Sequence, residues 1–175
     1  MRTPLLSSLL WLLALLLVGC VPHAFHETEP GRFEGEVQLR WISADTFVYE
    51  PNPAAPLRFE RPDGTVIEPG PVVTDGGSAP RAFWGIDGFS PWGYAPAFVL
   101  HDWLFQRYCC GLTPGGEEAF AESVAVMAEA LRTLIGDDPT DAELQHYRAI
   151  VAASAGPFAR YHWTTSTCRP VVEPW

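Results

Sequence analysis

A histidine and an aspartate stand side by side inside an apolar stretch, Phe98-Val99-Leu100-His101-Asp102-Trp103-Leu104-Phe105. An imidazole can act as a general base and a carboxylate can bind a cation, and burying either group is costly unless it is paired. Neighbouring residues of a helix point about 100° apart, so the two side chains suit different roles, such as a base and an ion ligand. The alternative is a core histidine bonded to a backbone carbonyl, and the residues alone leave both interpretations open.

A second candidate is the segment Thr74-Asp75-Gly76-Gly77-Ser78-Ala79-Pro80-Arg81. Its paired glycines allow backbone angles that other residues resist, so the loop can present the Asp75 carboxylate and the Ser78 hydroxyl toward one point. Arg81 can bind an anionic group such as a phosphate or a carboxylate. The alternative is a structural turn in which Asp75 and Ser78 cap nearby amide groups.

A third candidate is an acid on a later helix. Glu118 and Glu122 are four residues apart and share a helix face. Glu122 lies close to the apolar positions of that helix, whereas the other acids nearby are expected to be solvated. Glu122 is therefore the acid most suited to point inward.

The segments that must position these residues change character along the chain. Alternating and β-prone runs, broken by prolines, predict short strands, and Asp63-Gly64 predicts a two-residue hairpin turn. The expected strands are 36–41, 46–49, 57–61 and 65–67. Helical patterns follow at 95–108, from Thr113-Pro114 to Ile135, and at 140–155, where Thr140 and Glu143 form a capping box. The aromatic residues 158–163 are expected to pack the C-terminal tail. The fold class is therefore α+β, a small antiparallel sheet followed by about three helices in a single domain of residues 33–175.

The N-terminus has the layout of a cleavable signal peptide. Arg2 precedes an apolar run over 5–18, which is short for a membrane span of about 20 residues. The run ends in Leu17-Val18-Gly19-Cys20, which resembles the bacterial lipobox, the alternative being a simple secretory signal with an incidental cysteine. We expect cleavage after residue 19, attachment of lipid, including acyl chains such as palmitate, to Cys20, and a polar tether over 20–32. Val21 after the cysteine resembles the signal for the outer membrane, so the protein is expected on its periplasmic face.

The net charge and the cysteines limit the partners and the disulfides that this chain can be expected to have. The formal net charge is -10, with 21 acidic residues against 11 basic ones, which disfavours a nucleic-acid partner. An oxidising periplasm permits a disulfide. Cys168 is expected to pair with Cys109 or with Cys110, leaving one thiol over. No P-loop, dinucleotide fingerprint, G-x-S-x-G motif or common zinc spacing is present.

The Thr74–Arg81 segment, Trp84 and Leu100-His101-Asp102-Trp103-Leu104-Phe105 together resemble an uncharacterised family common in prophages and bacterial genomes. Its members carry T-D-x-x-S-x-P-R followed by H-D-x-L-Y, a helix with an Ala-Asp pair and a later Tyr-Arg-Ala-Val segment. Ala121-Glu122 and Tyr147-Arg148-Ala149-Ile150 fall at the last two places. The resemblance spans about residues 55–163 and implies no particular function.

The His-Asp helix followed by a helix with an inward acid is also similar to secreted phospholipases A-two. That resemblance implies His101 as the base that activates water, Asp102 as a calcium ligand and Glu122 as the acid that orients His101. The glycine-rich calcium loop of that class is not recognisable here, so Asp75 and its loop are the alternative source of ligands. Phe105 also stands where that class has a tyrosine.

The expected function is a cell-envelope lipoprotein with a metal-assisted hydrolase site, either phospholipase-like or acting on the cell wall. His101, Asp102 and Glu122 would be catalytic, Asp75 and Asp102 would bind a divalent cation, most plausibly calcium, and Ser78 and Arg81 would bind a lipid or peptidoglycan substrate. The rival interpretation is a non-catalytic envelope lipoprotein. In it, Asp75 accepts from backbone amides, His101 bonds a carbonyl and Arg81 pairs with Asp102 in a structural polar network.

Overall fold

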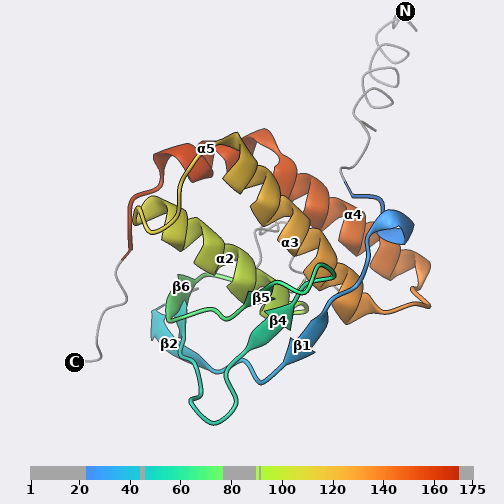
Figure 1. Ribbon diagram of the computed structural model, residues 1–175, viewed down its shortest axis with the longest axis horizontal. Helices are drawn as coiled ribbons and strands as arrows, with labels where there is room; N and C mark the ends of the chain where they lie inside the picture. The colour runs from blue at the N-terminus through green and yellow to red at the C-terminus, as the bar shows by residue number, and fades with distance from the viewer. Residues whose placement is uncertain (1–22, 44–45, 77–89, 91, 170–175) are drawn as a thin grey trace, which may run out of the picture.

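A computed structural model describes residues 23–43, 46–76, 90 and 92–169. These residues form two three-stranded antiparallel sheets and four α-helices, which confirms the α+β prediction. Figure 1 shows the helices lying together on one side of the molecule and the strands on the other. The two sheets replace the one small sheet that was expected, and the helices number one more than predicted.

The strands are short and divide between the sheets. One sheet has the order β1 (Arg32–Glu34), β4 (Arg58–Glu60) and β5 (Val66–Ile67). The other has the order β2 (Leu39–Ser43), β3 (Thr46–Tyr49) and β6 (Val72–Thr74). The predicted strand over 36–41 begins later, at Leu39, because Gly35 turns the chain with φ +80 and the Glu36 amide donates to Ala55 O. This turn is what separates β1 from β2 and places them in different sheets.

The predicted hairpin between β4 and β5 is confirmed. The Asp63 carboxylate accepts a hydrogen bond from the Thr65 amide at 2.8 Å. Gly64 adopts φ +83, a left-handed backbone conformation that glycine takes at little cost. The local sequence was sufficient to predict this hairpin, because the hydrogen bond and the glycine conformation both lie within the turn itself.

The helices are α2 (Ala95–Cys109), α3 (Glu117–Ile135), α4 (Asp141–Ala155) and α5 (Pro157–Thr165). The capping box of Thr140 and Glu143 starts α4 as predicted. The α3 helix begins later than its predicted start at Thr113, because the Thr113 hydroxyl accepts from Arg107 Nε at 3.0 Å instead of capping a helix. The aromatic segment 158–163 is itself helical, with Pro157 in the first turn of α5.

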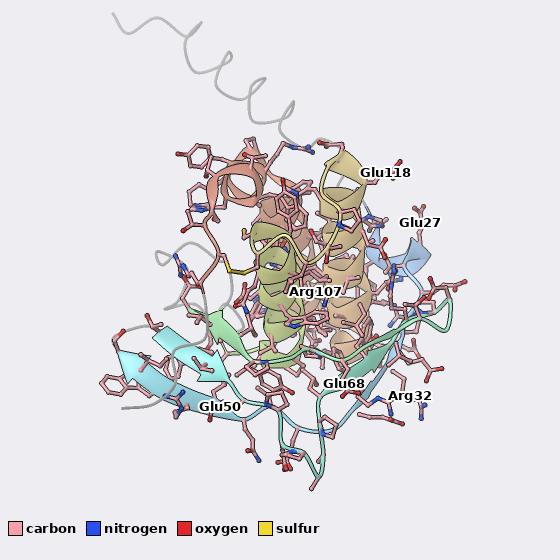
Figure 2. All side chains as sticks on the ribbon, turned by 60° about the vertical axis from the view of Figure 1, so that its left-hand side comes forward. Glu27, Arg32, Glu50, Glu68, Arg107 and Glu118 are labelled. Atoms are coloured by element: carbon pink, nitrogen blue, oxygen red, sulfur yellow. A yellow bond between two sulfur atoms is a disulfide. The ribbon has the colours of Figure 1, made fainter. Side chains whose placement is uncertain are left out.

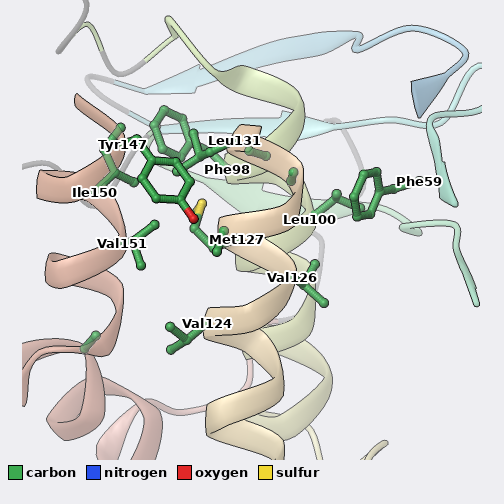
Figure 3. Close-up of a cluster of buried hydrophobic side chains, with 14 of the residues drawn as sticks. Phe59, Phe98, Leu100, Val124, Val126, Met127, Leu131, Tyr147, Ile150 and Val151 are labelled. Carbon is green, nitrogen blue, oxygen red and sulfur yellow. The ribbon is translucent and has the colours of Figure 1, made fainter. Parts of the chain in front are cut away.

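The main core lies where α2, α3 and α4 meet. Val126, Met127 and Leu131 of α3 are at most 1% exposed, and Tyr147 and Val151 of α4 are fully buried. Figure 3 shows these side chains packed between the helices, with Phe59 reaching in from β4. A smaller cluster of Tyr49, Leu57, Val72 and Val99 joins α2 to the sheet of β2, β3 and β6. Since α2 takes part in both clusters, it fixes the sheets relative to the helical layer.

The segment predicted to be a tether is packed on the domain from residue 23 onward, which corrects that prediction for the part that is described. The short 3-10 helix η1 (Phe25–Glu27) buries Phe25, whose ring meets Tyr147 edge-on at 5.1 Å between centroids. The Thr28 hydroxyl lies 2.9 Å from the Tyr147 hydroxyl, and the Gly31 amide donates to Thr133 Oγ1 at 2.8 Å. One large apolar residue in a polar stretch was enough to fasten the segment to the helices.

We therefore expect Phe25→Ala to lower the free energy of unfolding by about 3 kcal/mol, because it leaves a cavity over Tyr147. Urea denaturation of the full chain in detergent measures this. Glu29→Ala is the matched control, since Glu29 is exposed in the same segment and a surface change of this kind shifts stability by less than about 0.5 kcal/mol. Equal stability of the two variants would mean that this segment is a free tether after all.

Candidate functional site

The α2 helix directs its adjacent polar residues to different surroundings, as the helical angle requires. His101 is 3% exposed and its ring packs on Phe105 at 4.5 Å between centroids. Asp102 meets the end of β6, where the Thr74 hydroxyl hydrogen-bonds to its carboxyl. The structure therefore brings Asp102 to the Asp75 segment, whereas His101 turns toward an aromatic environment.

Thr74 forms the junction between this helix and the Asp75 loop. It is 2% exposed, and its Oγ1 accepts a hydrogen bond from the Gly76 amide at 3.1 Å. Asp75 is exposed beside it, close enough for its charge to act on Asp102. Thr74 is a member of the site that the sequence did not single out, although its place at the end of an alternating β run next to Asp75 was the available signal.

The carboxyl of Asp102 lies in a low-dielectric environment. Burial is the main cause that raises its pKa to about 8, and the nearby Asp75 carboxylate raises it further, against the opposing effects of Thr74 and Arg169. Asp102 keeps some exposed surface as a residue, but its Oδ2 is buried and has no hydrogen-bond partner in the described part of the chain. At neutral pH the folded protein therefore holds Asp102 largely in its neutral form.

Burial also keeps His101 neutral, because it disfavours the charged form of the imidazole. Burial lowers the pKa of its imidazole to about 4, since a charged ring would lose its hydration. Its Nε2 is buried and also lacks a hydrogen-bond partner among the described residues. A neutral imidazole can accept a proton, and its pKa of about 4 makes His101 a weak base at neutral pH.

The C-terminal tail adds a cation that the sequence did not reveal. Cys110, directly after α2, forms a disulfide with Cys168, and this selects one of the two expected pairings and leaves Cys109 as a free thiol. Figure 2 shows this disulfide as the yellow bond that holds the tail to the end of α2. Arg169 follows Cys168, and its charge lowers the pKa of Asp102 against the effect of burial. No local pattern marks Arg169, because only the disulfide carries it to the site.

Glu122 lies elsewhere and drops out of the site. Its carboxylate pairs with Arg61 of the β4–β5 hairpin, and its side chain is 53% exposed. Arg61 also donates to both carboxylate oxygens of Glu129, at 2.7 and 2.8 Å. Glu122 and Glu129 are seven residues apart and thus share the α3 face that meets the hairpin. These acids hold the sheet to the helix, and the structure does not bring Glu122 to His101.

Three of the predicted site residues, Cys20, Ser78 and Arg81, lie outside the described residues. Within the described ranges, no three or more His, Cys, Asp or Glu side chains gather so as to hold a metal ion. The same ranges contain no helix of the length and apolarity needed to cross a membrane.

A shallow hollow of about 70 Å³ lies elsewhere, over the sheet of β1, β4 and β5. It is lined by Arg32, Glu34, Arg58, Glu60 and Val66. Arg32 pairs with Glu60 at 2.7 Å and with Glu34 at 2.8 Å, so these acids are already neutralised by a neighbour. The acids of the hollow therefore already have charged partners, whereas buried atoms of Asp102 and His101 have none among the described residues.

Comparison of the chain with protein-family models, with curated proteins and with solved structures finds no match. The resemblance to the prophage family therefore stays a prediction.

We expect Asp102→Asn to change how stability depends on pH. Between pH 4 and pH 8 the folded protein binds a proton on Asp102 that the unfolded chain has released, so this group lowers the stability of the native protein as the pH rises. The asparagine side chain does not titrate, so the variant avoids this fall in stability with pH. It should be more stable than the parent chain at pH 8 by at least about 1.4 kcal/mol, the equivalent of one pKa unit. Urea denaturation at pH 5, 6.5 and 8, with chelator present, measures the difference.

The exposed Gln145 of α4 supplies the control for this comparison, since Gln145→Ala removes no titrating group and should differ from the parent by the same small amount at every pH. A difference between Asp102→Asn and the parent that does not change with pH would show that Asp102 is ionised in the fold.

Proposed function

We propose that this chain is a cell-envelope lipoprotein with a hydrolytic centre at Asp102, Asp75 and His101. The observation that carries the proposal is the Asp102 carboxyl, which is buried beside a second acid and has one oxygen without a partner among the described residues. An unsatisfied buried polar atom costs about 1–3 kcal/mol and needs an explanation. Binding of a substrate or an ion to this oxygen would explain why it is left without a protein partner.

The protonation states suit acid-base chemistry. Asp102 is neutral and can donate a proton, whereas His101 is neutral and can accept one. Asp75 is exposed and can reach a ligand from solvent. Groups whose surroundings drive their pKa values apart in this way are typical of catalytic sites.

The same pair of acids fits a divalent cation. Asp102 offers Oδ2, which has no partner among the described residues, and Asp75 offers a second carboxylate; binding of a cation would displace the proton that Asp102 carries in the metal-free protein. Calcium is the ion we propose, held by Asp75 and Asp102; when bound, it would polarise a carbonyl or phosphoryl group of the substrate. Ser78 and Arg81 are proposed to bind substrate from the same segment as Asp75.

One observation favours a second candidate, a non-catalytic envelope lipoprotein. His101 Nε2 and Asp102 Oδ2 are both sealed from solvent. In that alternative the polar groups lock the Asp75 loop onto α2 and carry out no reaction. The two candidates differ in whether substitution of His101 removes an activity or only stability.

We expect the full-length protein in detergent to release products from peptidoglycan or from phospholipid vesicles in millimolar calcium, and to lose at least 100-fold of that rate in His101→Ala, the scale of a lost general base. Calcium should also raise the Tm of His101→Ala, because a ligand that binds only the native state stabilises it. Asp75→Asn should lose this shift.

His162→Ala is the matched control, since His162 is exposed on α5 and should keep full activity. An inactive parent chain whose His101→Ala variant merely loses stability would favour the structural candidate. Unchanged Tm in calcium for every variant would remove the cation from the proposal.

The proposed anchor would hold the domain close to the lipid. Phe25 is packed into the core five residues after Cys20, and an extended chain of that length reaches about 17 Å at most. A lipid on Cys20 would thus hold the domain against the membrane surface, with no long tether. The proposed location is the periplasmic face of the outer membrane.

We expect Cys20→Ser to abolish incorporation of labelled palmitate in bacterial cells and to release the protein from the membrane fraction, because several acyl chains give the stable anchoring that a protein surface does not. Cys109→Ser is the control, since it removes the free thiol of the folded domain and should leave labelling intact. Labelling that survives in Cys20→Ser would contradict the lipid anchor.

A further inference from the structure

A row of aromatic side chains crosses the sheet of β2, β3 and β6 toward the candidate site. Trp41 of β2 is the cross-strand partner of Phe47 in β3, and Phe47 is the partner of Thr74 in β6. Directly opposed residues of antiparallel strands project from the same face, so these three side chains are neighbours on one surface. Trp92, just before α2, packs edge-on against Phe47 at 4.6 Å between centroids. We call Trp41, Phe47 and Trp92 the aromatic row.

The aromatic row runs from solvent to the buried acid. Trp41 is 65% exposed, Phe47 and Trp92 are half-buried, and Thr74 at the far end is 2% exposed and bonded to Asp102. Two strand spacings separate Trp41 from Thr74, about 9.5 Å. β2 is an outer strand in the described sheet, so Trp41 stands at its open side. Thr74 and Asp102 are buried at this end of the row, and the exposed Asp75, which follows Thr74, is the acid that a ligand on the row can reach.

The chemistry along the aromatic row changes from apolar to hydrogen-bonding. The faces of the aromatic rings carry a negative potential that attracts polarised C–H groups. At the other end lies the exposed carboxylate of Asp75, which can accept hydrogen bonds from a ligand. A ligand that suits both ends needs a flat apolar face and hydroxyl groups at its edge.

We propose that the aromatic row binds a glycan strand, with pyranose rings stacked on Trp41 and hydroxyl groups directed to the exposed carboxylate of Asp75. A pyranose has a C–H face that stacks on aromatic rings and an edge of hydroxyls that hydrogen-bond to carboxyl groups. The formal net charge of -10 also favours an uncharged ligand over an acidic polymer. The inference rests on the proposed function for its position beside the reactive acids, and it names the glycan part of the cell wall as the substrate class.

A lipid surface fits the same observations less well. Acyl chains would cover Trp41, but the Asp75 carboxylate at the end of the row would be carried toward hydrocarbon without a partner, which is unfavourable. A glycan satisfies both ends of the row at once. Binding through Trp41 to lipid vesicles is therefore the outcome that would replace this proposal.

The test is binding of N-acetylglucosamine pentamer to the full-length protein in detergent, measured by calorimetry in the absence of turnover. We expect saturable binding that weakens about tenfold in Trp41→Leu, equivalent to about 1.4 kcal/mol, because leucine keeps apolar surface and removes the ring face. Trp41→Tyr should retain most of the affinity. Both variants should keep the parent Tm, since Trp41 is mainly exposed.

Phe158→Ala provides the matched control, since Phe158 is a 72% exposed aromatic residue on α5 and should leave binding unchanged. Absence of pentamer binding, equal affinity of Trp41→Leu and parent, or Trp41-dependent binding to phosphatidylcholine vesicles in place of the pentamer would each overturn the proposal. If Trp41→Leu unfolds, the affinity of Trp41→Tyr for the pentamer tests the proposal instead. A tenfold loss of affinity in Trp41→Tyr would exclude stacking on the ring. Glycan binding without any hydrolysis would leave this inference standing and remove the hydrolytic centre.

Discussion

The packing of α2 between the helical layer and the sheet of β2, β3 and β6 is the interaction on which the rest of the structure depends. Ala97, Phe98, Val99, Leu100 and His101 are buried in succession, so this helix is enclosed around most of its circumference. Leu100 and Phe98 belong to the main core, whereas Val99 packs with Val72 and Tyr49 of the sheet. A helix with apolar residues on all sides is suited to such a central position. The α3 helix, the α5 helix and strand β6 pack directly against it.

This central position gives the polar residues of α2 their chemical character. A carboxyl or imidazole on a surface helix would titrate near its ordinary pKa, but enclosure keeps both Asp102 and His101 neutral at pH 7. Thr74 supplies one hydrogen bond to Asp102, and Oδ2 has no partner in the described part of the chain. This unfavourable burial is one of several in the described residues, and here it lies beside a second acid. Binding of a ligand at the proposed site would satisfy this oxygen, and Asp75 is exposed next to it.

The two ends of the chain are fastened to the same helical layer by different means. Phe25 inserts at the N-terminal end and contacts Tyr147 of α4, while Arg132 of α3 covers its ring at 4.7 Å. At the C-terminal end, the Cys110–Cys168 disulfide holds the tail to α2 and brings the charge of Arg169 within reach of Asp102. The proposed lipid anchor would act through the first of these attachments. The second makes the electrostatics of the site depend on a covalent bond far along the sequence.

The sequence by itself determined the elements whose causes are local. The Asp63-Gly64 turn, the Thr140 capping box and the apolar pattern of α2 appear where they were predicted, because each depends on residues within a few positions of one another. The tertiary structure alone decided which distant groups meet. It turned Glu122 to Arg61, paired Cys110 with Cys168, packed Phe25 on Tyr147 and aligned Trp41 and Phe47 with Thr74. Such choices follow from how whole faces of helices and sheets pack together, and the free energy of that packing is not contained in any short segment.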